Sequence, residues 1–215
     1  MPNPGEPRPT RQPSRDTRER LVRTAARLFL GRSYQSVGVN EICAATGVQK
    51  GSFYHFYPTK ADLAVAVIDL HASAMWERLD RHERAAVGPI NKILAGGDMV
   101  EEVQQGLAKR FGRVVGCPLG NLAIELATTD KVAAERLAQV FAAWQHRIAA
   151  HCRDAVAASL LLGGDADLDD LARRIVATLQ GMTLLAKAAD STVTVIPEAI
   201  RALVEQRLRD AGEHA

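Results

Sequence analysis

The stretch that most constrains the fold is residues 39–60, where two short helix-like segments are separated by a single glycine. Gly47 lies where the chain must turn, and glycine readily adopts the positive φ that such a turn often needs. The second segment carries Phe53 and Phe56 three positions apart, as expected for the inward face of a helix. It ends before Pro58, because proline disfavours helical geometry in the residue that precedes it. The pattern predicts two short helices joined by a tight turn.

Such a pair is a helix-turn-helix, whose second helix has the width to lie in the major groove of DNA. The side opposite the two phenylalanines carries hydrogen-bond donors and a tyrosine but no acid; its residues are Lys50, Ser52, Tyr54 and His55. A face without acids suits a polyanionic partner. An ordinary helical hairpin would also satisfy the pattern, so the residues alone leave that alternative open.

The segment from Gly47 to Leu63, Gly-Val-Gln-Lys-Gly-Ser-Phe-Tyr-His-Phe-Tyr-Pro-Thr-Lys-Ala-Asp-Leu, resembles the recognition helix and the next helix start of the tetracycline-repressor (TetR) family. The resemblance is strong over about residues 17–65, and elsewhere it is one of length and helix pattern. It implies a homodimeric transcriptional regulator, usually a repressor, that binds a palindromic double-stranded DNA operator and releases it when a small-molecule effector binds. The DNA contacts expected on this basis are Asn40, Lys50, Gly51, Ser52, Tyr54, His55 and Lys60, the last at a phosphate.

Charge is distributed unevenly along the chain. Residues 1–60 hold ten Lys and Arg against four acids, whereas residues 61–215 hold 17 against 21. We therefore expect a DNA-binding domain over 1–60 and an effector-binding and dimerisation domain over 61–215. The proline-rich residues 1–14 should form a disordered basic tail, whose arginines either reach the DNA or stay solvated.

Alanine and leucine recur throughout and aromatic residues make up only 5%, which favours an all-α fold of about nine helices. Asn40 is the expected N-cap of the helix before Gly47, and Thr59 with Asp62 should form a variant capping box. Gly96-Gly97 is expected to break the chain between two helices. The other helices should cover about 15–31, 49–57, 59–84, 98–115, 119–129, 131–161, 167–189 and 195–211, with a short turn of helix before residue 96.

The last two helices carry apolar stripes that the resemblance assigns to a four-helix interface between two subunits. The stripes consist of Leu171, Ile175, Leu179 and Met182 on one helix, and Ile196, Ile200, Leu203 and Leu208 on the other. Packing within a single subunit would explain the same stripes.

No phosphate-binding loop, dinucleotide fingerprint or serine-hydrolase motif is present, so we expect neither an enzyme nor a cofactor. His146 and His151 are five residues apart, off the spacing that places two metal ligands on one helical face, so no metal is expected. The odd number of cysteines argues against a disulfide framework and for the cytoplasm, and the chain lacks an apolar run that could span a membrane. A helical enzyme with a docking hairpin and a DNA-binding protein without an effector remain the alternatives.

The motif Gly116-Cys-Pro-Leu-Gly-Asn121 looks like a segment found in one subgroup of the TetR family. Pro118 suits the first position of a helix, which makes Cys117 its N-cap, where backbone N–H groups should lower the thiol pKa. Lys187 lies in an apolar run and could lower that pKa further or pair with an anionic ligand. We therefore expect Cys117 and Lys187 to sense an effector, an oxidant or an electrophile. A small buried cysteine and a lysine reaching solvent would be the structural alternative.

Overall fold

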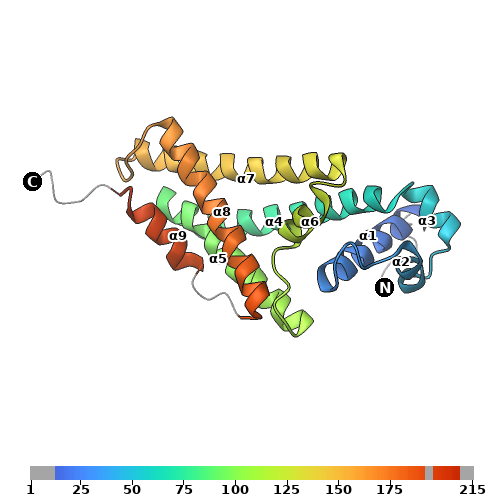
Figure 1. Cartoon of the computed structure of the whole chain (residues 1–215). Coiled ribbons are helices and arrows are strands. Elements are labelled where there is room, and N and C mark those ends of the chain that lie inside the picture. The colour runs from blue at the N-terminus through green and yellow to red at the C-terminus, as the bar shows by residue number, and fades with distance from the viewer. Residues whose placement is uncertain (1–12, 192–195, 209–215) are drawn as a thin grey trace, which may run out of the picture. The chain divides into compact units, whose positions relative to one another are not determined.

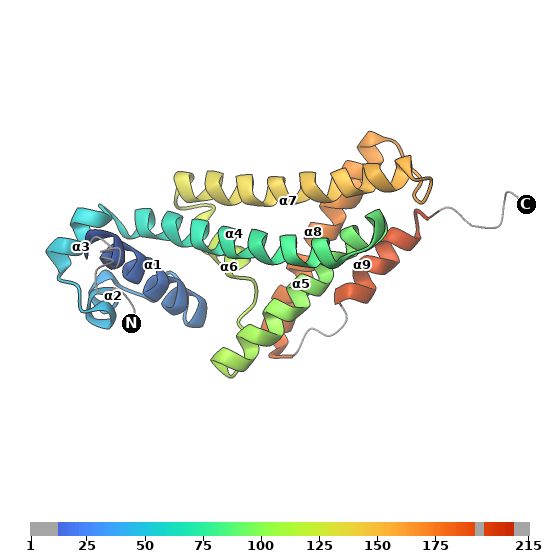
Figure 2. The ribbon, with the colours of Figure 1, turned by 180° about the vertical axis from the view of Figure 1, so that it is seen from behind.

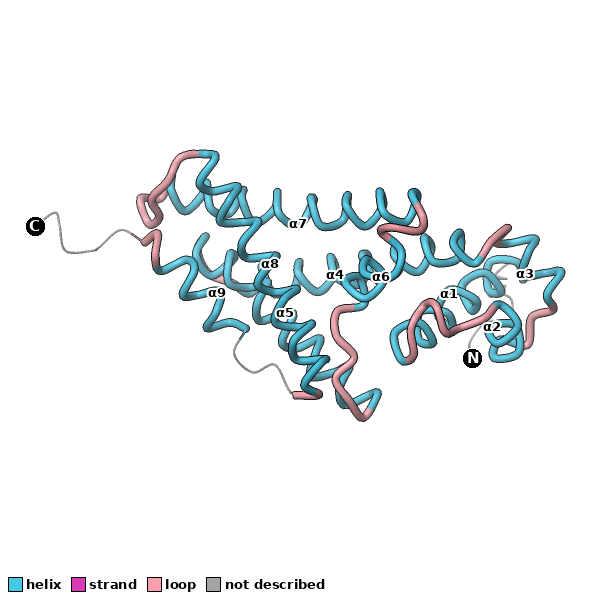
Figure 3. Tube along the Cα trace, in the orientation of Figure 1, coloured by secondary structure: helices cyan, strands magenta, loops and turns pink. Residues whose placement is uncertain are grey.

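The computed structural model describes residues 13–191 and 196–208, and its regular structure there is helical, with one isolated β-bridge between Leu161 and Leu208. The all-α expectation is confirmed, as Figures 1 and 3 show. Within the described ranges the helices are α1 (Pro13–Gly31), α2 (Val39–Thr46), α3 (Lys50–Phe56), α4 (Lys60–Ala85), α5 (Gly88–Phe111), α6 (Pro118–Leu126), α7 (Lys131–Ala157), α8 (Asp165–Ala189) and α9 (Ile196–Glu205).

The chain divides into two compact units, residues 1–70 and residues 71–215. We call their described parts the head and the body. The first turns of α4 belong to the head and its later turns to the body, so this helix contributes to both. The tail predicted over residues 1–14 lies mostly outside the described residues. Helix α1 already begins at Pro13, two residues earlier than expected, because the first turn of a helix tolerates proline.

In the head, α1 and α4 provide buried apolar faces and α3 adds one fully buried ring, Phe53. Phe56, expected beside it in the core, is only partly buried. Gly47 ends α2 with a φ of 67°, the left-handed conformation that the turn was predicted to need. The capping box is also confirmed: the Thr59 backbone N–H donates to Asp62 Oδ2 at 2.9 Å, and the Asp62 N–H donates to Thr59 Oγ1 at 3.1 Å.

The prediction that Asn40 is the N-cap of α2 is wrong. That helix begins at Val39 behind Gly38, which is extended with φ −89° and ψ 157° and makes no side-chain cap bond. The N-cap is Gly38, two residues before Asn40, although asparagine is the better capping residue. Asn40 is therefore the second residue of α2, and its side chain is exposed.

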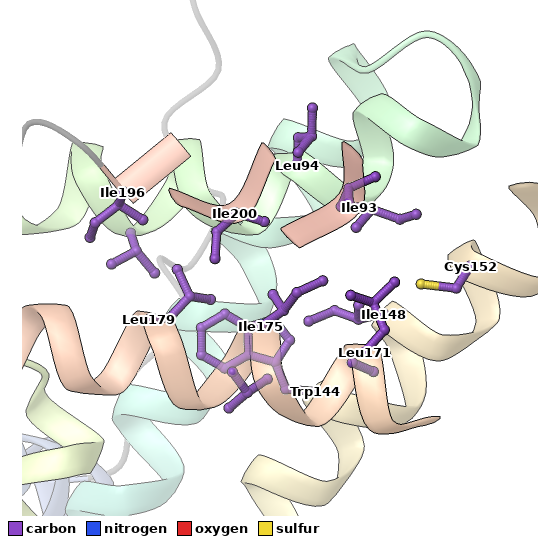
Figure 4. Close-up of a cluster of buried hydrophobic side chains, with 14 of the residues drawn as sticks. Ile93, Leu94, Trp144, Ile148, Cys152, Leu171, Ile175, Leu179, Ile196 and Ile200 are labelled. Atoms are coloured by element: carbon purple, nitrogen blue, oxygen red, sulfur yellow. The ribbon is translucent and has the colours of Figure 1, made fainter. Parts of the chain in front are cut away.

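The core of the body is formed by apolar side chains from α5, α7, α8 and α9, which meet around the buried indole of Trp144 (Figure 4). Leu171, Ile175 and Leu179 of α8 and Ile196 and Ile200 of α9 are all at most 2% exposed. The stripes expected at a subunit interface therefore pack within one subunit, and that prediction was wrong. A stripe shows that a helix face is covered, but the same pattern arises whichever helix covers it.

The predicted break at Gly96-Gly97 is also wrong, because α5 runs unbroken from Gly88 to Phe111 (Figure 2). Gly97 instead permits close helix packing, because a Cβ there would lie 3.3 Å from the Pro197 Cα of α9. A Cβ on Gly96 would make only an ordinary contact, 3.8 Å from Trp144 Nε1 of α7. The absent side chain of Gly97 lets α9 approach, which offsets the lower helix propensity of glycine.

No helix in residues 13–191 or 196–208 combines the length and apolar character needed to cross a membrane. Among the same residues, no three His, Cys, Asp or Glu side chains come together as metal ligands.

Candidate nucleic-acid interface and sensor segment

Most of the predicted DNA contacts lie together on one short helix, α3. Lys50, Gly51, Ser52, Tyr54 and His55 are all exposed, Tyr54 at 43%. The buried ring of Phe53 meets the Tyr54 ring edge-on, with the centroids 5.3 Å apart, and so helps to fix where the phenol points. The exposed side chains of α3 therefore offer an ammonium, a hydroxyl, a phenol and an imidazole.

Gln49, the N-cap of α3, is a further exposed polar residue that sequence reasoning missed. Its side chain makes no capping hydrogen bond. A glutamine amide can pair with an adenine edge in the major groove. The position of Gln49 at the start of α3 is the sequence signal that could have identified it as a DNA contact.

Lys60 occupies a different environment from the other predicted contacts. Its Nζ donates to the carbonyl oxygens of Tyr34 at 2.9 Å and Val37 at 3.1 Å, and lies 4.0 Å from the centroid of the Tyr34 ring. The ammonium therefore ties the start of α4 to the link between α1 and α2. Its contact with a phosphate stays a prediction.

Cys117 is the N-cap of α6, as predicted, and its Sγ accepts a hydrogen bond from the Gly120 N–H at 3.4 Å. The expected lowering of its pKa is wrong. Burial raises the pKa of the thiol, and this outweighs the opposing hydrogen bonds from the Gly120 backbone, the Gln180 side chain and the Leu119 backbone. Cys117 is partly buried, whereas Cys43 and Cys152 are buried, and burial raises the pKa of Cys152 to about 11.

Lys187 is exposed, which fits the alternative of a lysine that reaches solvent from an apolar run. Its Nζ donates to Asn121 Oδ1 at 2.9 Å, and Asn121 Nδ2 donates to the Val115 carbonyl at 2.8 Å. Lys187 thus reaches the sensor segment, residues 113–121, through Asn121. Asp190 holds the same segment through its Oδ1, which accepts from the Val114 N–H at 2.9 Å.

These partners of the sensor segment lie on α8 or at its end, 63 to 76 residues further along the chain. Gln180 packs so closely that a Cβ on Gly120 would lie 2.6 Å from its Oε1. Sequence analysis singled out Lys187, but no local signal pointed to Gln180 or Asp190, because only the packing of α8 brings them to this segment.

The described residues form a helical fold, and the second helix of its helix-turn-helix exposes hydrogen-bond donors. These two features are typical of a DNA-binding protein of the helix-turn-helix class. Comparison with known proteins agrees. Residues 21–67 match the family described as bacterial regulatory proteins, tetR family, and residues 98–206 match the tetracyclin repressor-like C-terminal domain. The chain belongs to the TetR family of bacterial transcriptional regulators.

Individual relatives support this assignment over most of the chain. The transcriptional regulator AcuR of Cereibacter sphaeroides is 34% identical over 168 residues, which are 78% of this chain and 74% of AcuR. The repressor NemR of Escherichia coli K12 is 32% identical over 114 residues, 52% of this chain and 54% of NemR. A TetR regulator from Chloroflexus aurantiacus has a crystal structure that superposes with a TM-score of 0.78 at 31% identity, covering 92% of this chain and 98% of that one. The protein is thus a DNA-binding transcriptional regulator of a family that binds operators as dimers and responds to small-molecule effectors.

Proposed function

We propose that this protein is an effector-responsive repressor that binds a palindromic operator as a homodimer and acts in the cytoplasm, without enzymatic activity. The observation that carries the proposal is the exposed, acid-free face of α3. Its operator contacts would be Asn40, Lys50, Gly51, Ser52, Tyr54, His55 and Lys60. The name of NemR, a transcriptional repressor, supports repression over activation.

Release of the operator requires the effector to bind the DNA-incompetent state more tightly than the DNA-bound state. Helix α4 is suited to carry the difference, since its turns contribute to both units. Operator binding that no compound found in a thermal-shift screen alters would contradict the effector response.

We propose the outward face of α8 as the surface that receives the second copy. With the apolar stripe of α8 buried in its own subunit, the small residues Ala177 and Ala188 and the larger Leu184 and Leu185 remain exposed, the leucines at 49% and 70%. Ala177, Leu184 and Ala188 are seven and four residues apart, so they share one side of the helix, and Leu185 lies at the edge of that side. A matching pair of such faces forms a two-fold interface, which the palindromic operator mirrors.

Leu185→Glu should therefore give a monomer at micromolar concentration, because it replaces the most exposed leucine of that surface, 70% exposed, with a carboxylate that the interface would bury. Light scattering measures the mass, and operator binding should weaken at the same time. Leu162→Glu is the matched control: Leu162 is also exposed, at 46%, but lies in the connection between α7 and α8. A wild-type protein that is itself monomeric, or a Leu185→Glu protein that stays dimeric, would contradict the interface.

For the effector, we propose that Cys117 reacts with an electrophile, with Lys187 and Asn121 holding its segment to α8. Addition of an α,β-unsaturated carbonyl would join Sγ to the β-carbon, break the carbon–carbon π bond and place a proton on the α-carbon. Gln180 already fills the space over Gly120, so the added group must displace the start of α6. Helix α6 packs on α7, which is tied through Arg147 to Glu83 of α4.

An α,β-unsaturated aldehyde should release wild-type protein from its operator but not Cys117→Ser, and Cys152→Ser should respond as wild type does. The raised pKa of Cys117 makes the thiolate scarce near neutrality, so the rate should rise about tenfold per pH unit below that pKa. Equal release in wild type and Cys117→Ser would remove Cys117 as the sensor. Release of wild type by small carboxylates that Lys187→Met abolishes would instead place an anion at Lys187.

A further inference from the structure

Arg18 lies at the N-terminal end of the inward face of α1. Arg18, Val22, Ala25 and Phe29 follow one another at intervals of three or four residues, so they lie on the same side of the helix. The last three are buried, at 9% exposed or less, whereas Arg18 is exposed. Its guanidinium therefore lies where the core of the head meets solvent.

Two aromatic rings hold that guanidinium in place. Arg18 Cζ lies 5.8 Å from the centroid of Phe56 and 5.3 Å from that of Tyr57. Both distances are within the range of a cation–π interaction, and an arginine plane stacks well on such rings. Phe56 is the last residue of α3 and Tyr57 is its C-cap, so the cation is fixed at the end of the recognition helix.

No acid in the described part of the chain lies within ion-pair distance of Arg18, although other cations of the head have such partners. Arg23 pairs with Glu19 at 2.8 Å, and Arg32 with Glu41. Aromatic rings orient a cation without neutralising it, because they carry no net charge. Arg18 is thus both oriented in advance and left with its full charge.

We propose that Arg18 contacts a DNA phosphate at the edge of the major groove, positioned there by Phe56 and Tyr57. A recognition helix in the groove has sugar–phosphate strands on either side, and arginine binds phosphate oxygens through paired N–H donors. The contact adds a residue of α1 to proposed contacts that come from α2, α3 and the start of α4. Because the rings already restrict the Arg18 side chain, less side-chain entropy is lost when it binds a phosphate.

The test compares Arg18→Gln with Arg27→Gln by fluorescence anisotropy, on the operator and on an unrelated duplex, over a series of salt concentrations. Arg27 is also exposed on α1, but it lies nine residues further along and so on the opposite side of the helix. Arg18→Gln should weaken binding to both duplexes and reduce the slope of log K against log salt by about 0.9 per subunit. Arg27→Gln should leave the slope unchanged.

An unchanged slope in Arg18→Gln overturns the proposal even if binding weakens, as it would if Arg18 only covered the two rings. Equal slope changes in both variants also overturn it, because they would report net charge alone. Phe56→Leu should weaken DNA binding in the wild-type background and have little further effect with Arg18→Gln; additive effects would exclude positioning by the ring. If the wild-type protein bound neither duplex, the proposed DNA-binding function of the head would itself be refuted.

Discussion

Replacing Arg147 with methionine should lower the free energy of unfolding of the body by about 3 kcal/mol, as expected when one partner of a buried ion pair is removed. Arg147 of α7 donates from Nε to both carboxylate oxygens of Glu83 in α4, at 2.9 and 3.0 Å. Its Nη2 donates to Asp80 Oδ1. Glu83 is only 8% exposed, so loss of the guanidinium would leave a buried carboxylate whose remaining side-chain partner is the His151 ring, 3.2 Å away.

Urea unfolding at neutral pH measures this loss, and Arg153→Met is the matched control. Arg153 also bridges two acids, Asp165 and Asp169, but at an exposed site where such pairs contribute about 0.2–1 kcal/mol. A loss for Arg147→Met no larger than that of the control would show that the pair does not hold α4 to α7.

The contribution of this pair should depend on pH in a defined direction. Burial alone would raise the pKa of Glu83, but hydrogen bonds from His151 and Arg147 outweigh it and hold the pKa below its usual 4.5. A carboxyl with a lowered folded-state pKa stabilises the fold above its unfolded pKa, and this stabilisation is lost as the pH falls through the folded value. The difference between wild type and Arg147→Met should therefore shrink once the pH falls below about 4.5.

Phe53→Ala should cost the head about 3–5 kcal/mol, because it removes a fully buried ring from a small core. Operator binding would then be lost through unfolding. The neighbouring Tyr54→Ala should leave the head folded, since Tyr54 is 43% exposed, and should weaken operator binding by about tenfold, near the lower end for a base contact.

Thermal unfolding followed by circular dichroism, together with operator binding, separates the two variants. Phe53→Ala should lower the unfolding temperature of the head, whereas Tyr54→Ala should lower only the affinity. Wild-type operator affinity in Tyr54→Ala would remove this residue from the proposed contacts. An equal fall in unfolding temperature for both would make Tyr54 part of the core.

Much of the head could be predicted because its determinants are local. The positive φ at Gly47, the reciprocal bonds between Thr59 and Asp62, and the end of α3 before Pro58 each involve residues at most four apart. The outward face of α3 follows from the same short-range geometry, since burial of Phe53 directs its neighbours outward. Asn40 failed as a cap because a good capping residue does not determine where the chain enters the helix.

The site around Cys117 shows where local reasoning stops. The sequence correctly placed the thiol at the start of α6, but its pKa depends on burial, which residues from other parts of the fold supply. Desolvation there exceeds the stabilisation by nearby N–H groups, so the predicted direction was reversed. The bond from Lys187 to Asn121 spans 66 residues and depends on the packing of α8.

By itself, the sequence determined the all-helical fold, the helix-turn-helix and the face of α3 that carries the donors. These follow from backbone preferences and from the 3.6-residue period, which act within one or two turns of a helix. Only the tertiary structure decided what each apolar or small residue packs against. Gly97 became a site of close approach between α5 and α9, the stripe of α8 was covered within its own subunit, and Arg18 came to lie on the rings at the end of α3. The physical reason is that a pattern of residues reveals that a surface will be covered, whereas the covering element is chosen by contacts between segments far apart in the chain.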